Sequence, residues 1–336
     1  TIVDESTFTV KVPSLTTFGE IPLSMTIHGV EMNMGGYAAF EILASPVITS
    51  VETDNKFSSK AVQVGNTVTI KGTGFRNSTI SSATFGGQDL NYTVVSDTEI
   101  TASVSEQCAE GEDVITFKFD DVVVDVVSSD KLNMLKAGSD ISDYILTNVK
   151  QPFESKEGKT SGHCTPVGWK FNYGAGNDGF CHNESEIEMP GEGLYMNDQG
   201  GLLVIQSGWE GRSKKMNGKM FQTFNIPQGV YDVVIDVAEL ATNGNGRKKA
   251  GLFISKGGEE QTPNMDSSGN WTENTNLLKS VDFYMPGETY SENYKDRRFV
   301  IENLTIDYEG ETTLGFAVHF DSNRALKISS IKVLLK

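Results

Sequence analysis

Apolar and polar side chains alternate along short stretches of this chain, which indicates strands rather than helices. The sequences FTVKV (residues 8–12) and LSMTI (residues 23–27) show this pattern, because side chains two positions apart share one face of a sheet. Similar stretches recur in the C-terminal part of the chain, at residues 201–205, 220–226, 231–237, 250–254, 299–306, 313–320 and 326–335. No stretch of comparable length there has the helical period. We therefore expect an all-β protein.

The same pattern occurs twice in the first part of the chain, at an offset of 92 residues. Residues 5–43 align without a gap to residues 97–135, so that apolar positions match apolar positions and turns match turns. Gly19, for example, falls on Gly111. Such self-similarity predicts two copies of one structural module.

The two copies are not equally complete. The second extends back to Pro46 and makes a whole module, residues 46–136, whereas residues 1–45 match only the second half of the pattern. Half a β-sandwich leaves unpaired strand edges and an open core. We therefore expect a missing start of roughly 45 residues, from the offset of the repeat. The alternative is that residues 1–45 are a degenerate module that packs on its neighbour.

Short strands separated by glycine turns make the complete module typical of an immunoglobulin-like β-sandwich. Its most distinctive stretch is VTIKGTGF, residues 68–75, in which two glycines allow a sharp turn and Phe75 supplies an anchor for the core. This stretch resembles the IPT/TIG domain, an immunoglobulin-like fold of receptors, transcription factors and bacterial surface proteins. The resemblance covers roughly residues 1–136 and implies spacer modules, so no ligand site is assigned there.

Residues 137–336 form a more aromatic region that contains all three tryptophans. Its stretch KMFQTFNIPQGVY, residues 219–231, reads as a strand, a turn at Pro227 and Gly229, and a second strand. This stretch resembles a ligand element of the galactose-binding-like jelly roll found in many carbohydrate-binding modules. The resemblance implies a jelly-roll β-sandwich that binds a glycan.

The order of the modules carries a wider resemblance. IPT/TIG modules followed by such a domain resemble the SusE/SusF-like surface glycan-binding lipoproteins of Bacteroidota, which belong to polysaccharide-utilisation systems. This resemblance implies a location at the cell surface, an outer-membrane glycan-uptake complex as partner, and anchoring by a lipidated N-terminal cysteine that is not in this chain. The first residues, TIVDES, also lack the basic start and apolar core of a signal peptide.

Charge and cysteine content exclude several other classes. The chain has 28 Lys and Arg against 45 Asp and Glu, a formal charge of -17, so its surface repels nucleic-acid phosphates. No apolar run approaches the roughly 18 residues of a membrane span. The cysteines have neither zinc-ligand spacing nor a disulfide framework. We expect Cys108 to be unpaired, while Cys164 and Cys181 are either bridged or free.

Three long loops of the C-terminal region combine aromatic rings with planar polar groups, which is what sugar recognition requires. The candidate glycan-binding residues are Tyr173 within residues 162–201, Trp209, Glu210 and Arg212 within residues 207–213, and Trp271, Asn276 and Tyr284 within residues 261–292.

These candidates also have structural interpretations. Trp209 is either an exposed platform or a buried core ring. Trp271 lies in a polar stretch that offers little core to enter. We therefore keep two alternatives for it, exposure for ligand stacking and burial. Tyr284 is expected to pack under its loop. The structural alternative for the polar candidates Glu210, Arg212 and Asn276 is that they are solvated loop residues. Trp169 and Phe171 alternate as strand residues do, so we expect them in the core.

Motifs for catalysis are missing from the sequence. It has no GxSxG elbow and no HExxH helix, and its four histidines are scattered. We therefore predict a non-enzymatic protein that binds polysaccharide or oligosaccharide without a cofactor; a structural calcium ion stays open and unassigned. The rival prediction is a cell-adhesion or protein–protein interaction protein without a sugar site. Glycan binding predicts exposed, coplanar rings in one cleft of the C-terminal domain, whereas adhesion predicts a broad, flat patch.

Overall fold

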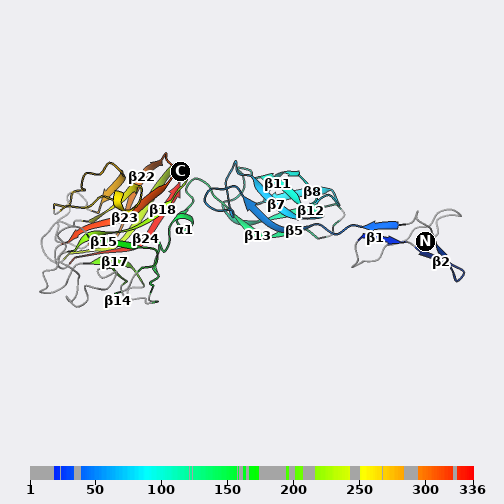
Figure 1. Ribbon diagram of the computed structural model, residues 1–336, viewed down its shortest axis with the longest axis horizontal. Helices are drawn as coiled ribbons and strands as arrows, with labels where there is room; N and C mark the ends of the chain where they lie inside the picture. The colour runs from blue at the N-terminus through cyan, green and yellow to red at the C-terminus, as the bar shows by residue number, and fades with distance from the viewer. Residues whose placement is uncertain are drawn as a thin grey trace. The chain divides into compact units, whose positions relative to one another are not determined.

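The structure is a computed structural model with two compact units, Thr1–Leu135 (unit 1) and Lys136–Lys336 (unit 2) (Figure 1). It describes residues 19–22, 24–33, 39–120, 122, 124–156, 158, 162–163, 166–173, 194–196, 201–206, 216–242, 250–266, 268–283, 294–320 and 324–336. Within these ranges strands dominate, and the helical elements are the short helix α1 (Ser142–Ile145) and the 3-10 turn η3 (Glu259–Gln261). The predicted all-β fold class is confirmed.

In unit 1, residues 46–135 form a sandwich of two sheets (Figure 1). The first sheet has the strand order β10-β11-β7-β5, and the second has the order β6-β13-β12-β8-β9. The strands of the first sheet are β5 (Val47–Thr53), β7 (Val68–Thr73), β10 (Asn91–Val94) and β11 (Glu99–Ser103). Those of the second are β6 (Ala61–Val62), β8 (Ile80–Phe85), β9 (Gln88–Asp89), β12 (Gly111–Phe119) and β13 (Val126–Met134).

The core of this sandwich is closed by Phe75, which is buried as predicted from the VTIKGTGF stretch. Gly72 makes room for this ring. A Cβ atom at Gly72 would lie 2.4 Å from the Phe75 ring and 2.0 Å from the carbonyl oxygen of Val47, so only glycine allows both to approach the strand. Cys108 is buried in the same core as a free thiol, which confirms that prediction.

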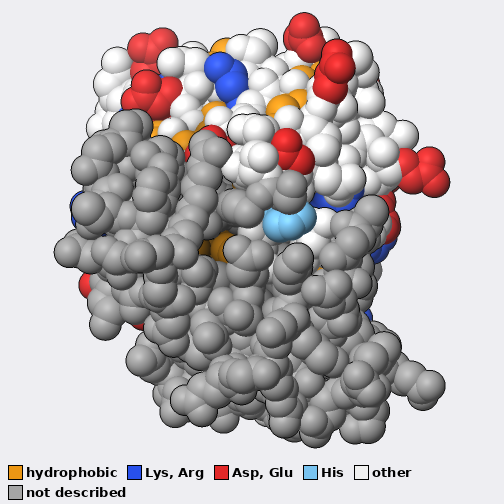
Figure 2. Space-filling view, turned by 90° about the vertical axis from the view of Figure 1, so that its left-hand side faces the viewer, with side chains coloured by type: hydrophobic (Ala, Val, Ile, Leu, Met, Phe, Trp, Pro, Cys, Tyr) orange, Lys and Arg blue, Asp and Glu red, His pale blue; other side chains and the backbone are white. Residues whose placement is uncertain are grey.

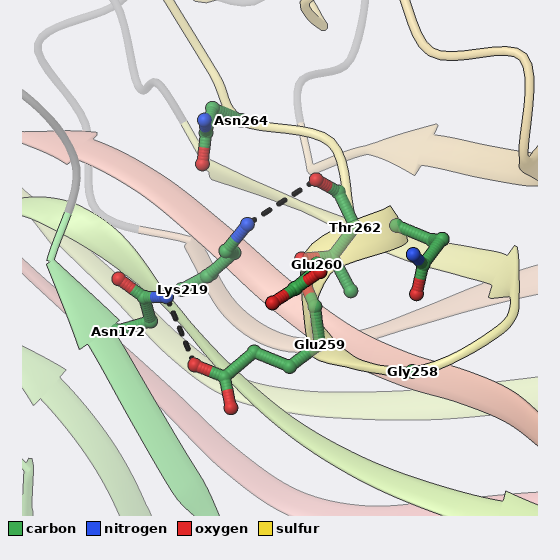
Figure 3. Close-up of a pocket in the computed structure, with 8 residues that line it drawn as sticks. Asn172, Lys219, Gly258, Glu259, Glu260, Thr262 and Asn264 are labelled. Atoms are coloured by element: carbon green, nitrogen blue, oxygen red, sulfur yellow. Dashed lines mark hydrogen bonds between the residues drawn. The ribbon is translucent and has the colours of Figure 1, made fainter.

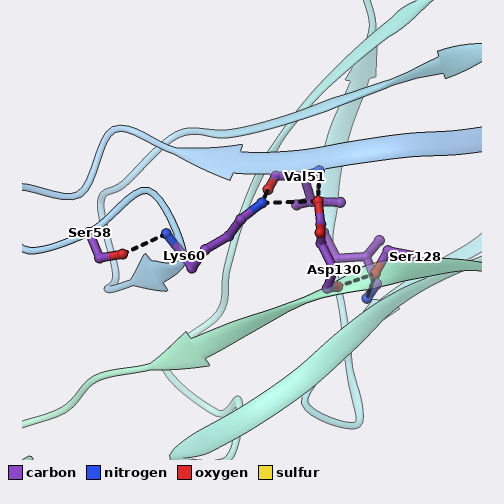
Figure 4. A network of polar contacts seen from close by, with 6 residues as sticks. Val51, Ser58, Lys60, Ser128 and Asp130 are labelled. Carbon is purple, nitrogen blue, oxygen red and sulfur yellow. Dashed lines mark hydrogen bonds and ion pairs between the residues drawn. The ribbon is translucent and has the colours of Figure 1, made fainter.

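A polar network joins the two sheets of the module (Figure 4). Lys60 Nζ donates to Asp130 Oδ2 (2.9 Å), on β13, and to the carbonyl oxygen of Val51 (2.6 Å), on β5. The same carboxylate accepts the backbone N–H of Val51 (3.0 Å). Hydrogen bonds from Val51 and then Lys60 hold the pKa of Asp130 below its ordinary value. Asp130 therefore fastens β5 to β13 across the sandwich.

The N-terminal strands repeat part of this pattern. β1 (Gly19–Pro22) pairs with β4 (Ala39–Ile42), and β2 (Ser24–Ile27) pairs with β3 (Val30–Asn33). Gly19 lies opposite Ile42, and in the complete module Gly111 lies opposite Met134. Both partners are displaced by the offset of the sequence repeat. The repeat therefore recurs in the backbone pairing of β1 with β4 and of β12 with β13.

Unit 2 is a second β-sandwich (Figure 1). One sheet, in the order β14-β16-β17-β24-β19-β22, contains β14 (Gly162–His163), β16 (Leu194–Met196), β17 (Leu203–Gln206), β19 (Gly229–Thr242), β22 (Tyr294–Ile306) and β24 (Arg324–Leu335). The other, in the order β15-β18-β23-β20-β21, contains β15 (Lys170–Tyr173), β18 (Met216–Asn225), β20 (Ala250–Lys256), β21 (Leu277–Asp282) and β23 (Glu311–Phe320).

A line of aromatic rings marks the core between these two sheets. Phe316, on β23, lies 6.0 Å from Phe283, and Phe283 lies 4.9 Å from Phe299, on β22 of the opposite sheet. Trp169 stacks on Phe316 at 5.8 Å and donates its indole N–H to the carbonyl oxygen of Asn148. Trp169 is buried, which confirms its predicted core position.

Candidate functional site

The outer face of the five-stranded sheet in unit 2 carries a second, smaller apolar cluster. Because Phe316 faces the core between the sheets, its neighbour Ala317 faces outward. The segment between β20 and β21, which we call the strap (residues 257–266 and 268–276), crosses this outer face. Met265 and Trp271 of the strap pack there with Phe253. We name this group, together with Phe221, Ala317 and Leu277, the outer cluster.

A polar pocket lies beside the outer cluster, between the sheet and the first part of the strap (Figure 3). Its volume is about 820 Å³, within the range of roughly 300–1,000 Å³ that is usual for small-ligand sites. The lining residues are Asn172 on β15, Lys219 on β18, and Gly258, Glu259, Glu260, Gln261, Thr262 and Asn264 on the strap. Asn172 and Lys219 are cross-strand partners, so their side chains share the outer face.

Lys219 is the most unusual member of the pocket. The residue is only 7% exposed, yet among the described residues its ammonium group donates one hydrogen bond, to the carbonyl oxygen of Thr262 at 3.2 Å. An ammonium group has three N–H donors. Burial lowers the pKa of Lys219, and the nearby charge of Glu259 partly opposes this shift. Within the part of the chain that the structure describes, two donors of this desolvated cation are therefore without a protein acceptor.

The rest of the pocket is held in place by hydrogen bonds. Asn172 Nδ2 donates to Glu259 Oε1 at 3.0 Å, as Figure 3 shows. The second half of the strap supports the first: Asn274 Nδ2 donates to the carbonyl oxygen of Gln261 (2.9 Å), and the backbone N–H of Asn264 donates to Thr272 Oγ1 (2.9 Å). The polar groups of the rim are thus positioned before any ligand arrives.

Trp271 anchors the strap to the sheet. Its indole N–H donates to Asp282 Oδ1 at 2.7 Å, and its ring meets Phe253 edge-on at 6.1 Å. A Cβ atom at Gly251 would lie 2.6 Å from the ring, so the indole occupies the space of the missing side chain. Trp271 is half-buried. Stacking of a ligand on its remaining surface stays a prediction.

The other predicted site residues are placed unevenly. Asn276 is half-buried in the strap, where its backbone N–H donates to Asn274 Oδ1 at 2.8 Å. Tyr173 follows Asn172 on β15, and its backbone lies opposite Gly218. The candidates Trp209, Glu210, Arg212 and Tyr284 lie outside the described residues, as do Cys164 and Cys181.

Residues of the stretch KMFQTFNIPQGVY have two different roles, some in the fold and one in the lining of the pocket. Gln222 is buried and bonds both the backbone N–H and the carbonyl oxygen of Thr147. Tyr231 is buried and donates to the carbonyl oxygen of Pro227 at 2.6 Å; burial raises its pKa to about 12. These two residues hold the fold together. Lys219, which begins the stretch, is the one that lines the pocket.

Sequence reasoning overlooked the pocket for an identifiable reason. The third candidate loop begins at Gln261, two residues after Glu259, and Lys219 lies in the stretch that resembles a ligand element but is not among the candidate site residues. The motif itself is the available signal, because Lys219 lies next to the apolar pair Met220 and Phe221, and a lysine that becomes buried beside them needs a polar partner.

The visible surface at one end of unit 2 is mainly polar. Figure 2 shows acidic side chains spread over its upper part, with hydrophobic atoms in small areas between them. In the described parts of the chain, no helix is long and apolar enough to span a membrane, and no group of three or more His, Cys, Asp or Glu is arranged to hold a metal ion.

Comparison with known families assigns part of the chain. Residues 46–130 match the model described as the IPT/TIG domain. They are an IPT/TIG domain. Residues 147–287, which include the strap and the pocket, match a model described as a domain of unknown function, DUF5013. A search of the curated proteins found no match.

Several solved structures are similar in part. TmCBM61 in complex with beta-1,4-galactotriose has 14% identity and a TM-score of 0.26, covering 51% of this chain and 90% of its own. SGBP-B from a complex xyloglucan utilization locus in Bacteroides uniformis has 12% identity and a TM-score of 0.24, covering 94% and 86%. The K3 adhesin domain of Lys-gingipain from Porphyromonas gingivalis has 11% identity and a TM-score of 0.30, covering 55% and 98%. Similarity at this level identifies neither a ligand nor a site in this chain.

Proposed function

We propose that unit 2 is a non-catalytic glycan-binding domain, that its site is the pocket between the five-stranded sheet and the strap, and that the IPT/TIG domain is a spacer. In this proposal the protein binds polysaccharide or oligosaccharide at the cell surface. Anchoring to an outer membrane and a partnership with a glycan-uptake complex belong to the same proposal. Calcium has no assigned place in it.

The observation that supports the proposal is the buried ammonium of Lys219, which faces a pocket of about 820 Å³ and, among the described residues, uses one of its three donors. A buried polar group with unused hydrogen-bonding capacity is costly, and a ligand oxygen that completes it is correspondingly favoured. The remaining lining is amide, hydroxyl and carboxylate, as in Asn172 and Glu259. Such a lining suits a ligand rich in hydroxyl groups and disfavours an apolar one.

Binding without catalysis is the simpler role for the carboxylates of this pocket. Glycoside hydrolysis requires one carboxyl group to act on the glycosidic bond while a second assists. Glu259 is exposed and already accepts a hydrogen bond from Asn172, which suits it to hold a sugar hydroxyl. We expect no release of reducing ends when the protein is incubated with a polysaccharide that it binds.

The experiment is affinity gel electrophoresis of the full chain against a panel of polysaccharides, followed by calorimetry with oligosaccharides of those that retard it. The panel includes beta-1,4-galactan, the polymer of the galactotriose bound in one solved structure above, and xyloglucan, which names the utilization locus of another. Asn172→Ala should weaken binding about tenfold, because it removes one lining donor and frees Glu259 from its partner.

The matched control is Asn91→Ala, which removes an exposed asparagine from a hollow of unit 1. It should leave affinity unchanged. Retardation by some member of the panel, lost with Asn172→Ala and kept with Asn91→Ala, supports the proposal. If no polysaccharide retards the chain, or if Asn172→Ala and Asn91→Ala bind the polysaccharide equally well, the pocket is not a glycan site. The result then favours the alternative of an adhesion protein without a sugar site.

A further inference from the structure

The charges around the pocket are unequal, and this bears on which glycans can enter. One ammonium, that of Lys219, faces two carboxylates, those of Glu259 and Glu260, and the other lining residues are uncharged. Figure 3 shows both carboxylates on the strap side of the pocket, with Lys219 rising from the sheet. The lining therefore carries a net negative charge.

The positive charge of Lys219 is already compensated in part. Glu259 is close enough to counteract the effect of burial on the pKa of Lys219. Glu260 is exposed at the rim, where an arriving chain passes it. An anionic group entering the pocket therefore meets an ammonium whose charge is partly offset by Glu259 and a second carboxylate that repels it. The formal charge of -17 on the whole chain adds repulsion of the same sign.

Hydrogen-bonding capacity points the same way. A sugar hydroxyl both donates and accepts, so it can accept from Lys219 while it donates to Glu259 or Glu260. A uronate carboxylate or a sulfate only accepts, so it cannot donate a hydrogen bond to either glutamate. The lining thus matches neutral sugar residues in both charge and hydrogen bonding.

From this we infer that the pocket selects uncharged sugar residues and excludes those that carry a carboxylate or sulfate. This inference rests on the proposed function, since it concerns the ligand class of the same site. It assigns the selection to Glu259 and Glu260, and it leaves the attraction of the sugar to Lys219 and Asn172.

The test uses sugars that differ in charge alone. Oligosaccharides of beta-1,4-galactan and of beta-1,4-glucan are each prepared in three forms: neutral, oxidised at C6 to the uronate, and oxidised and then methyl-esterified. The ester keeps the carboxyl carbon of the uronate, adds one methyl group and removes the charge. The full chain is titrated with all six by calorimetry at low and at high salt.

For whichever backbone binds, we expect the ester to bind within about threefold of the neutral form and the uronate at least tenfold more weakly at low salt. High salt should narrow that gap, because it screens exposed charges. The double variant Glu259→Gln, Glu260→Gln should narrow it as well, and because the gap compares the ester and the uronate on the same variant, it is independent of any change in affinity for the neutral form. The matched control Glu52→Gln, Asp54→Asn, at exposed positions of unit 1, should leave the gap as it is.

The outcomes separate the two proposals. If the uronate binds as tightly as the ester, or if the double variant leaves the gap unchanged, charge selection by the pocket is wrong while glycan binding stands. If only uronates bind, the inference is reversed and the function again survives. If none of the six oligosaccharides binds and no polysaccharide of the panel retards the chain, both the proposed function and this inference are wrong.

Discussion

The two units handle a lysine in opposite ways. Lys60, in unit 1, is partly exposed and bonds both a carboxylate and a carbonyl oxygen, so its charge is used to fasten two sheets. Lys219, in unit 2, is buried and bonds one carbonyl oxygen. A charged group whose hydrogen-bond partners belong to the protein stabilises the fold. A buried charged group with unused donors instead favours the binding of a ligand that accepts hydrogen bonds from them. The contrast separates the structural role of Lys60 from the binding role that we propose for Lys219.

The hollows of the two units differ accordingly. The hollow of unit 1, of about 390 Å³, is lined by uncharged residues on and beside β10 and β11: Thr67, Asn91, Tyr92, Thr93, Thr101, Ala102 and Ser103. The hydroxyl of Tyr92 is already bonded to the carbonyl oxygen of Ile80. The pocket of unit 2 is larger and contains both signs of charge. This difference favours unit 2 as the unit that binds.

The largest effect is expected from replacing each of the two lysines by methionine and comparing the changes in glycan affinity and in stability. Lys219→Met should weaken binding of the best polysaccharide about 30-fold, about 2 kcal/mol, because it removes hydrogen bonds from a charged donor. The stability of unit 2 should fall by less than about 1 kcal/mol, since methionine keeps the apolar stem and removes a buried charge. Calorimetry and thermal unfolding of the full chain measure the two effects.

Lys60→Met is the counterpart and should do the reverse, with affinity unchanged and unit 1 less stable. If Lys219→Met binds the polysaccharide as tightly as the unchanged protein, the two lysines do not differ in role, and the proposal that the pocket is the glycan site is wrong.

A smaller effect is expected at the carboxylate that Lys60 bonds. Asp130→Ala should destabilise unit 1 by about 1–2 kcal/mol, because the backbone N–H of Val51 loses its acceptor and the ammonium of Lys60 keeps only the carbonyl oxygen of Val51. Hydrogen exchange of unit 1 amides, measured by mass spectrometry on the full chain, should report this loss as faster exchange in β5 and β13. Asp89→Ala, at an exposed position on β9, serves as the control and should change neither strand.

The smallest effect is a dependence of unit 1 on pH. The pKa of Asp130 lies below its ordinary value of 3.8 in the folded protein, chiefly because the backbone N–H of Val51 bonds the carboxylate. A carboxyl group with a lowered pKa stabilises the fold fully above its unfolded pKa, and this contribution disappears as the pH falls through the folded pKa. The stability difference between the unchanged protein and Asp130→Ala should therefore hold from neutral pH to about pH 5 and shrink below pH 3.8.

Denaturant unfolding at a series of pH values measures that difference. A gap that stays constant down to pH 3 would mean that the carboxylate of Asp130 contributes no charge-dependent stability.

The sequence by itself determined the all-β class, the repeat and several core positions. These follow from short-range rules: side chains alternate across a strand, and glycine permits turns and close approaches. That is why Phe75 and Trp169 could be placed in cores without a structure. The offset between repeats also predicted which backbone positions correspond, as the pairings of Gly19 and Gly111 illustrate.

Only the tertiary structure decided where the candidate site lies. Lys219 and Glu259 are far apart in the sequence and meet because the strap folds back over the sheet, which no local pattern encodes. Trp271 looked free to meet a ligand because its neighbours in sequence are polar, yet Gly251 leaves a space on the sheet that its ring fills. Strand alternation is fixed by the backbone over two residues, whereas a pocket depends on which distant strands become neighbours.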